Sequence, residues 1–306
     1  MTPLLRRPGV KSIHALSTIL PKLRSASQFS TTSNTHRELI VVRHGETDWN
    51  RQLKVQGATD IPLNATGRLQ AQASAQALAS YFHPHKVPVV VHSSEKSRAV
   101  ETAETIANAL QEEQWLDVTA HEELADGNTK TNSITVLRHE ELNEWNLGVL
   151  EGLTKEEALA EYPDDWNTFS EWADPLVSTE HAQTVIAEGE SMEEVRLTAV
   201  NCLEEIVNSA KDEAADPIVV VSHGGLLAQL LRHVVVAQYP QDRQDAIRND
   251  PASRDKLLKY HRPKNACITH FSIDPRTNLW EIEKWADISH LKGDAAPLDA
   301  NYKGGR

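Results

Sequence analysis

The sequence predicts an α/β fold, a three-layer α/β/α sandwich around a mostly parallel central sheet. Three short apolar runs rich in β-branched residues, 38–42, 87–91 and 218–221, predict buried strands. Segments with helical periodicity lie between them, and strands that alternate with helices favour a parallel sheet. Each run ends in a polar loop that contains a histidine. Because parallel sheets bind ligands at the carboxyl ends of their strands, these loops are expected to form one site.

The other regular elements follow from the same patterns. Apolar residues recur with helical spacing in five segments: 66–79, 96–110, 155–160, 191–210 and 226–237. Two apolar runs near the end of the chain, 267–273 and 279–285, flank a turn at 274–278 and predict a closing hairpin.

The periodicity of residues 112–143 is weak. Residues 112–143 and 153–190 are expected to be helical or loop insertions over the active site. Residues 238–262, rich in Asp, Arg and Gln, are compatible with a loop, a lid, a dimer contact or a short helix.

Charge and composition exclude several classes of function. The formal net charge of −13 argues against nucleic acid or an anionic membrane as the main partner. The sequence contains no run of 18 apolar residues, so it predicts no transmembrane helix. Cys202 and Cys267 are too few for a disulfide framework, and neither belongs to a CxxC pair. No histidines show HExxH spacing, so no metal site is expected.

The first 37 residues differ in kind from the rest. They contain six basic residues, a cluster of serines and threonines, and no acidic residue before Glu38. This composition predicts a transit peptide, and the mitochondrion is favoured because Ile13, Leu16 and Leu20 can line one helical face. A disordered leader on a cytoplasmic protein is the alternative. Without these residues the formal net charge would be about −19.

Short motifs occur in a fixed order along residues 38–291. They are Arg43-His44-Gly45-Glu46, 59–63 with 66–67, Ser93-Ser94 with Arg98, Leu142-Asn143-Glu144 with Gly148 and 151–152, 189–191, Ser222-His223-Gly224, and Asn265 with 287–291. Together they resemble the histidine phosphatase (phosphoglycerate mutase-like) superfamily, and 151–154 and 189–191 resemble its broad phosphatase branch. The resemblance implies a phosphoglycerate mutase-like fold, a catalytic domain at 38–291, a tail at 292–306, and no cofactor.

The resemblance also assigns the two chemical roles. It implies that His44 attacks phosphorus, which requires a lone pair on one ring nitrogen while a backbone carbonyl holds the other as N–H. It implies that Glu144 protonates the leaving oxygen and then takes a proton from water, which requires a raised pKa. The nearby acids Glu140, Glu141 and Glu151 are expected to be solvated surface groups.

A phosphate site is implied around His44. Guanidinium groups match phosphate geometry, so Arg43 and Arg98 would hold the phosphoryl oxygens. His223 and the backbone N–H of Gly224 would add donors at the start of a helix. Asn50 would donate to the phosphate or orient the nucleophile.

Residues near the reacting group bear on the choice of substrate. Gln56 and Gly57 match the family's substrate loop, and Trp145 follows the acid Glu144. In the mutase branch an arginine follows that acid and binds a carboxylate. Loss of such a charged partner costs about 1.5–3 kcal/mol. Since 153–190 is also rich in acidic residues, we expect phosphomonoester hydrolysis rather than mutase activity.

Other functions of the same fold stay open at this point. Phosphoglycerate mutase activity primed by a bisphosphoglycerate is the second hypothesis, because one fold can host both reactions. A protein phosphatase and a non-catalytic binding protein are weaker alternatives. The expected substrate is a small phosphorylated metabolite, and the sequence does not indicate an oligomeric state.

Overall fold

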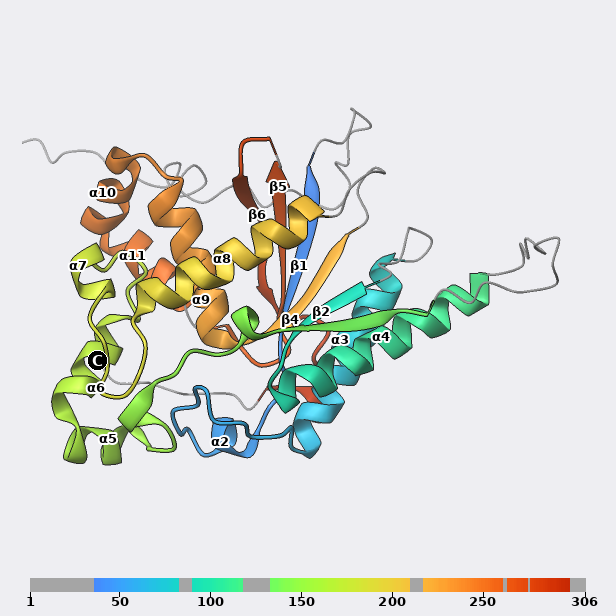
Figure 1. The fold of residues 1–306 in the computed structure, drawn as a ribbon, viewed down its shortest axis with the longest axis horizontal. Helices are drawn as coiled ribbons and strands as arrows, with labels where there is room; N and C mark the ends of the chain where they lie inside the picture. Colours follow the sequence, from blue (N-terminus) through green and yellow to red (C-terminus); the bar gives the residue numbers. More distant parts are fainter. Residues whose placement is uncertain are drawn as a thin grey trace, which may run out of the picture.

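One six-stranded sheet forms the centre of the molecule (Figure 1). The computed structural model describes residues 36–82, 90–117, 133–209, 217–260, 263–274 and 276–297. The strands are β1 Arg37–Arg43, β2 Val90–Ser94, β3 Thr135–His139, β4 Ile218–Ser222, β5 Ile268–Asp274 and β6 Leu279–Asp287. Their order is β3-β2-β4-β1-β5-β6, and only β5 runs against the others. The mostly parallel sheet is thus confirmed.

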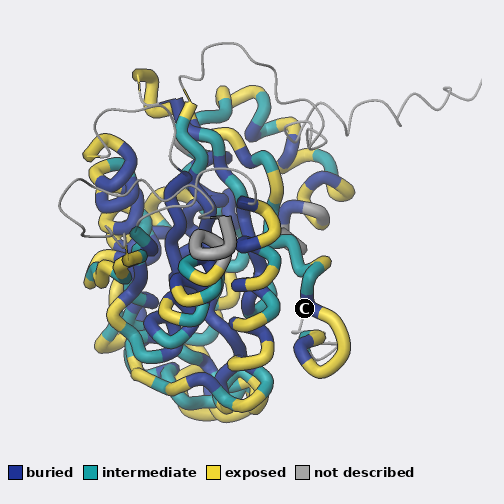
Figure 2. The backbone as a smooth tube through the Cα atoms, turned by 90° about the vertical axis from the view of Figure 1, so that its right-hand side faces the viewer, coloured by how far each residue is buried: buried dark blue, intermediate teal, exposed yellow. Residues whose placement is uncertain are grey.

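Helices cover both faces of this sheet, which confirms the three-layer sandwich. On one face, α3 (Ala65–Phe82) and α4 (Ser97–Asp117) pack against Ile40 and Val42 of β1. On the other, α8 (Met192–Ser209) and α9 (Gly224–Arg232) pack against Leu39 and Val41. Alternate residues of the buried strand therefore serve opposite cores, as a period of two requires. Figure 2 shows the buried strands enclosed by helices whose outer faces are exposed.

The predicted elements agree with the structure, apart from their bounds and one strand. β2 ends at Ser94 rather than at 91, and the first residues of the predicted strand, 87–89, lie outside the described residues. The predicted insertion at 112–143 contains strand β3 and the 3₁₀ helix η1 (Glu140–Leu142), with 118–132 outside the description. The helix expected at 226–237 begins at Gly224 and ends as a π-helix, η3 (His233–Ala237).

The segment 153–190 folds beside the loops that follow the acid motif. It forms α5 (Lys155–Glu161), α6 (Pro163–Glu171) and α7 (Thr179–Ala182). Trp172 from this segment and Trp145 from the acid loop belong to one apolar cluster, with ring centroids 5.1 Å apart. This cluster also includes Val55, so it joins the insertion to two loops near the nucleophile.

Residues 238–262, for which the sequence left several structures open, contain two helices, α10 (Gln241–Asn249) and α11 (Pro251–Tyr260). The remaining short helices are α2 (Asp48–Arg51), η2 (Gly148–Leu150) and η4 (Gly293–Ala295). Within the predicted tail, Ala295 of η4 is buried, and η4 lies against α3. None of the described helices is long and apolar enough to cross a membrane.

Candidate active site

The carboxyl ends of three adjacent parallel strands bring the site together. His44 directly follows β1, His223 directly follows β4, and their ring centroids are 5.1 Å apart. Ser94 is the last residue of β2. In the sheet, β2 lies next to β4, on the side away from β1. The histidine that follows the predicted strand at 87–91, His92, is in neither a loop nor this site. It lies within β2, where its Nδ1 bonds to Nε2 of His139, 2.9 Å away.

The backbone fixes the tautomer of His44. Its Nδ1 lies 2.6 Å from the carbonyl oxygen of Gly45. A carbonyl oxygen can only accept, so Nδ1 carries the hydrogen and Nε2 keeps its lone pair. Burial, followed by the charges of Arg98 and Arg43, holds the pKa of His44 well below its usual value. The ring is thus neutral near pH 7 and has a nucleophilic nitrogen.

The loop that carries His44 is held by close backbone packing and by an amide. A Cβ on Gly45 would lie 2.2 Å from the carbonyl oxygen of Gly67, so no larger residue fits there. Asn265 donates through Nδ2 to the carbonyl oxygens of His44 (3.2 Å) and Gly45 (3.3 Å), and to Oδ1 of Asn50 (2.9 Å). These contacts hold the carbonyl group that orients the nucleophile.

Two arginines flank the nucleophile, one partly buried and one fully buried. Arg43 donates from Nη1 to the carbonyl oxygen of Pro263 at 2.6 Å. Arg98, which is fully buried, donates to the carbonyl oxygens of Thr59 (3.0 Å) and Gly57 (2.9 Å). Burial lowers the pKa of Arg98 to about 10, so the group stays charged at neutral pH. In both side chains Nε is buried and has no partner in the described chain.

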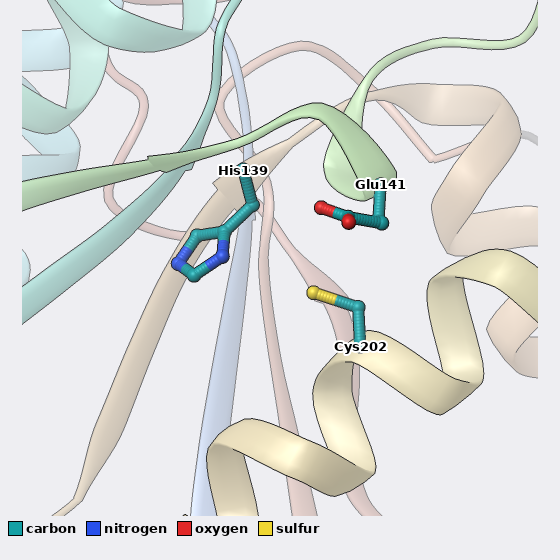
Figure 3. Close-up of side chains that lie close together, drawn as sticks. All are labelled: His139, Glu141 and Cys202. Carbon is teal, nitrogen blue, oxygen red and sulfur yellow. The ribbon is translucent and has the colours of Figure 1, made fainter.

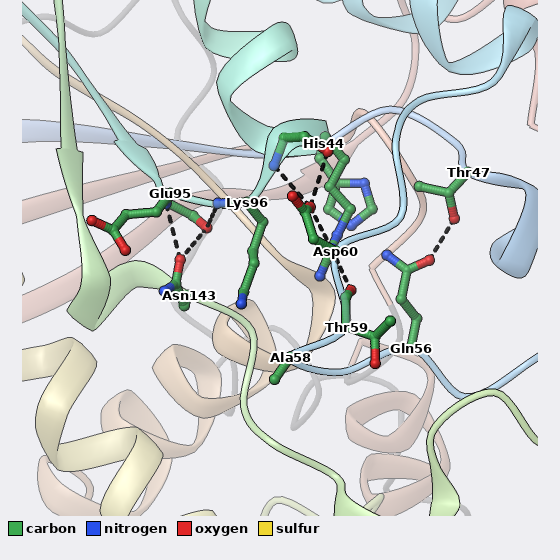
Figure 4. A network of polar contacts seen from close by, with 12 residues as sticks. His44, Thr47, Gln56, Ala58, Thr59, Asp60, Glu95, Lys96 and Asn143 are labelled. Carbon is green, nitrogen blue, oxygen red and sulfur yellow. Dashed lines mark hydrogen bonds and ion pairs between the residues drawn. The ribbon is translucent and has the colours of Figure 1, made fainter.

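A chain of hydrogen bonds orients His223. Oδ1 of Asn143 accepts from the backbone N–H of Glu95 and from the hydroxyl of Ser94, 2.9 and 2.7 Å away (Figure 4). The Ser94 hydroxyl is therefore free to accept from Nε2 of His223, at 2.7 Å. Nδ1 of His223 is buried without a partner in the described chain. Burial, with Arg98 next, holds the pKa of His223 well below its usual value.

The two site histidines are therefore expected to take up protons when an anion binds. A bound dianion offers acceptors to Nδ1 of His223 and Nε2 of His44 and raises both pKa values. Affinity for sulfate, a dianion that does not titrate in this range, is expected to fall as the pH rises from 5 to 8. The fall reaches at most about tenfold per pH unit for each proton taken up.

Competitive inhibition by sulfate at several pH values measures this dependence. His223→Asn keeps a donor near the position of Nδ1 but cannot titrate. In this variant the affinity for sulfate should therefore depend less steeply on pH, by up to about tenfold per pH unit, which corresponds to one proton fewer taken up. An unchanged slope in this variant would show that His223 does not take up a proton.

Glu144 lies in the loop between η1 and η2 and contacts the first turn of α9. Its Oε2 accepts from the backbone N–H of Gly225 at 3.1 Å, while Oε1 is buried without a partner in the described chain. A Cβ on Gly225 would lie 2.4 Å from Oε1 of Glu144, so glycine leaves room for the carboxyl group. Burial raises the pKa of Glu144, against the opposing effect of the Gly225 hydrogen bond. The carboxyl group is thus suited to carry a proton.

The remaining predicted residues differ in their position. Asn50 lies in α2, where its Oδ1 accepts from the backbone N–H of the N-cap residue Thr47 and from Nδ2 of Asn265, which leaves Nδ2 of Asn50 as its available donor. Oε1 of Gln56 accepts from the hydroxyl of Thr47 (Figure 4). The carbonyl oxygen of Gly57 accepts from Arg98, so its role in the structure is to hold that arginine. Trp145 is buried in the apolar cluster with Trp172 rather than open to a substrate.

Glu151 holds two loops of the site together, a role that the sequence did not predict. It was expected to be a solvated acid, but its carboxylate accepts from the backbone N–H groups of Ala58 (2.7 Å), Thr59 (2.9 Å) and Leu147 (3.0 Å). The loop at 57–59 supplies both carbonyl oxygens that hold Arg98. Glu151 thus links the acid loop to the position of Arg98.

Replacing Glu151 with alanine is expected to lower kcat/KM by about 10- to 100-fold. Hydrogen bonds to a charged group are each worth about 1.5–3 kcal/mol, and part of this energy positions the arginine. The loss should appear mainly as a raised KM in steady-state assays. Glu156→Ala on the exposed face of α5 is the control. A loss of kcat alone, at unchanged KM, would contradict a positioning role.

These groups form a candidate site for a tetrahedral anion. Arg43, Arg98 and His223 each have a buried nitrogen, and Glu144 has a buried oxygen, without a partner in the described chain. The ring centroids of His44 and His223 are 5.1 Å apart, and the charges of Arg43 and Arg98 act on the pKa of both His44 and Glu144. Among the described residues, the group of His, Cys and acidic side chains that is close enough to share a metal ion lies elsewhere and contains none of these residues.

A model of the histidine phosphatase superfamily, branch 1, matches residues 39–130 and 125–271. The chain belongs to this superfamily. It is therefore an enzyme of the phosphoglycerate mutase-like type, as its motifs predict.

Similar proteins cover almost all of the catalytic part. Phosphoglycerate mutase-like protein 4 of Arabidopsis thaliana is 29% identical over 280 residues, which cover 92% of this chain and 97% of that protein. A metal-independent phosphoserine phosphatase of the same plant is 27% identical over 270 residues, covering 85% and 90%. The structure of a mycobacterial glucosyl-3-phosphoglycerate phosphatase matches with a TM-score of 0.59 at 25% identity, covering 82% and 99%.

Proposed function

We propose that this histidine phosphatase hydrolyses small phosphomonoesters through a phosphohistidine formed on His44. One observation carries the proposal: the N–H of Nδ1 is held on the Gly45 carbonyl, which leaves the Nε2 lone pair available. The unpartnered nitrogens of Arg43 and Arg98 beside it supply donors for the phosphoryl oxygens, and Nδ1 of His223 becomes a third donor when the bound anion brings a proton to it.

The reaction proceeds in two displacements at phosphorus. In the first, Nε2 of His44 forms a bond to phosphorus while the ester P–O bond breaks, and Glu144 gives its proton to the leaving oxygen. In the second, Glu144 takes a proton from water as the water oxygen bonds to phosphorus and the P–N bond breaks. The two arginines keep the phosphoryl charge neutralised throughout. Glu144 ends protonated, as it began.

Hydrolysis is favoured over phosphoglycerate mutase activity. Trp145 stands where the mutase branch has an arginine, and its indole is buried against Trp172. A neutral buried ring offers no charge for a sugar-acid carboxylate. Relatives named as phosphatases support the same choice.

A panel of phosphomonoesters tests the proposal. Phosphate release is measured for p-nitrophenyl phosphate, phosphoserine and several sugar phosphates, with a chelator present. Conversion of 3-phosphoglycerate to 2-phosphoglycerate is measured in parallel, with and without a bisphosphoglycerate primer. Hydrolysis should exceed mutase turnover under all conditions. Primer-dependent mutase turnover that exceeds hydrolysis would overturn the proposal.

We also propose that residues 1–37 direct the catalytic domain at 38–291 to the mitochondrion. The support is their basic, serine-rich composition without acidic residues. Residues 1–35 lie outside the described part of the chain. A fluorescent protein fused after residue 37 should enter mitochondria, and the fusion with Arg6, Arg7 and Arg24 changed to glutamate should not. Cytoplasmic fluorescence of the first fusion would favour the cytoplasmic alternative.

A further inference from the structure

A second group of chemically active side chains lies at the carboxyl end of β3, facing α8. His139 is the last residue of β3, Glu141 lies in η1, and Cys202 lies in α8 (Figure 3). One ligand atom from each residue lies within 4.8 Å of the other two. None of the three belongs to the active site, and the reaction proposed above does not use them.

The orientation of His139 leaves one nitrogen directed to the other two residues. Its Nε2 is engaged with Nδ1 of His92, 2.9 Å away, on the neighbouring strand. Figure 3 shows the ring beside Glu141 and Cys202, with a nitrogen on that side. When Nε2 donates its hydrogen to His92, the lone pair of His139 lies on Nδ1. Histidines that bind metals are commonly oriented in this way, through a hydrogen bond from the other nitrogen.

We propose that His139, Glu141 and Cys202 form a site for a zinc-like divalent cation. Imidazole nitrogen, thiolate sulfur and carboxylate oxygen are the donors that Zn²⁺ takes in proteins, with water in a fourth position. Tetrahedral coordination needs these atoms about 3.5 Å apart, so they must approach by about 1 Å. The exposed side chain of Glu141 can supply this movement. Coordination displaces the thiol proton to solvent.

Burial and access at this site are consistent with binding from solution. Cys202 is only 8% exposed, whereas Glu141 is exposed and forms the open side. Among the described residues, no side-chain hydrogen bond or ion pair of Glu141 or Cys202 is found, so a cation would displace no partner in that part of the chain.

A cation bound here would tie the acid loop to α8. Glu141 precedes the proton donor Glu144 by three residues, and Asn143 between them belongs to the hydrogen-bond chain of His223. The site lies outside the reacting groups, so it would stabilise this loop without taking part in phosphoryl transfer. The proposal does not depend on the activity proposed above.

Metal titration of the full-length protein tests the site. Chelator-treated protein is titrated with Zn²⁺ by calorimetry, and with Co²⁺ while thiolate-to-cobalt absorption is followed in the near ultraviolet. We expect one ion per chain and a raised Tm. His92→Phe should weaken Zn²⁺ binding by about 10- to 100-fold, as loss of an orienting partner does. Cys202→Ser should abolish the near-ultraviolet band.

Two adjacent glutamates give a matched control that does not disturb folding. Glu140 and Glu141 are both exposed, but only Glu141 belongs to the cluster. Glu141→Gln should weaken Zn²⁺ binding by at least about tenfold, and Glu140→Gln should not. Equal affinities in the two variants, or no saturable binding to the wild type, would reject the site. Phosphate release measured in the same samples keeps this outcome separate from a failure of the proposed function.

Discussion

Replacing His44 with alanine is expected to lower kcat for phosphate release by at least about 10⁴-fold. The variant keeps the two arginines that bind a phosphate, but it lacks the Nε2 lone pair of His44 that forms the P–N bond. Hydrolysis of p-nitrophenyl phosphate measures the loss of kcat. Brief incubation with a ³²P-labelled substrate, followed by an alkaline quench, measures the acid-labile phosphohistidine.

A second histidine variant separates chemistry from folding. His270 lies on β5 and bonds to Glu38 at 3.1 Å, away from the site. His270→Ala should keep the activity and the phosphoenzyme, and both variants should keep the wild-type circular dichroism. Hydrolysis by His44→Ala at a rate near that of the wild type would exclude His44 as the nucleophile.

Strong local patterns made most of the fold predictable. The four central residues of β1 and all of β4 are buried, so each strand contains a continuous apolar run, and the long helices of both layers have clear periodicity. β3 was missed because it is an edge strand, paired only with β2, and three of its five residues are exposed. Its sequence therefore has no apolar run. The four residues of α2 are too few to show a period.

The proximity of the two site histidines was predictable because both follow strands whose ends must meet, whereas the role of Glu144 was implied only by the family resemblance. The positions of His44 and His223 depend only on β1 and β4 being parallel neighbours. Their supporting contacts were not predictable in the same way. Glu151 bonds to backbone groups more than 90 residues away, and Asn265 bonds to the His44 loop across about 220 residues. Backbone carbonyl and N–H groups have no sequence signature, so only the folded chain identifies these partners.

The largest effect after the loss of His44 is expected for Glu144→Gln, and its size should depend on the leaving group. Alkyl phosphates leave as strongly basic alkoxides unless an acid protonates them, so their kcat/KM should fall by about 10²–10⁴-fold. The p-nitrophenolate ion leaves without a proton, so phosphorylation of His44 by that substrate should change little. Hydrolysis of the phosphohistidine needs the same carboxylate as a base. A burst of p-nitrophenol and an accumulated phosphoenzyme should therefore appear.

The pH profile gives an independent test of the same role. Burial raises the pKa of Glu144, and only the protonated form can donate to the leaving oxygen. For an alkyl phosphate, wild-type kcat/KM should therefore fall as the pH rises through this pKa, and Glu144→Gln should lack that limb. Glu140→Gln, an exposed neighbour, should keep the wild-type profile. An equal loss for both kinds of leaving group would place Glu144 among the binding residues instead, because binding does not depend on the basicity of the leaving oxygen.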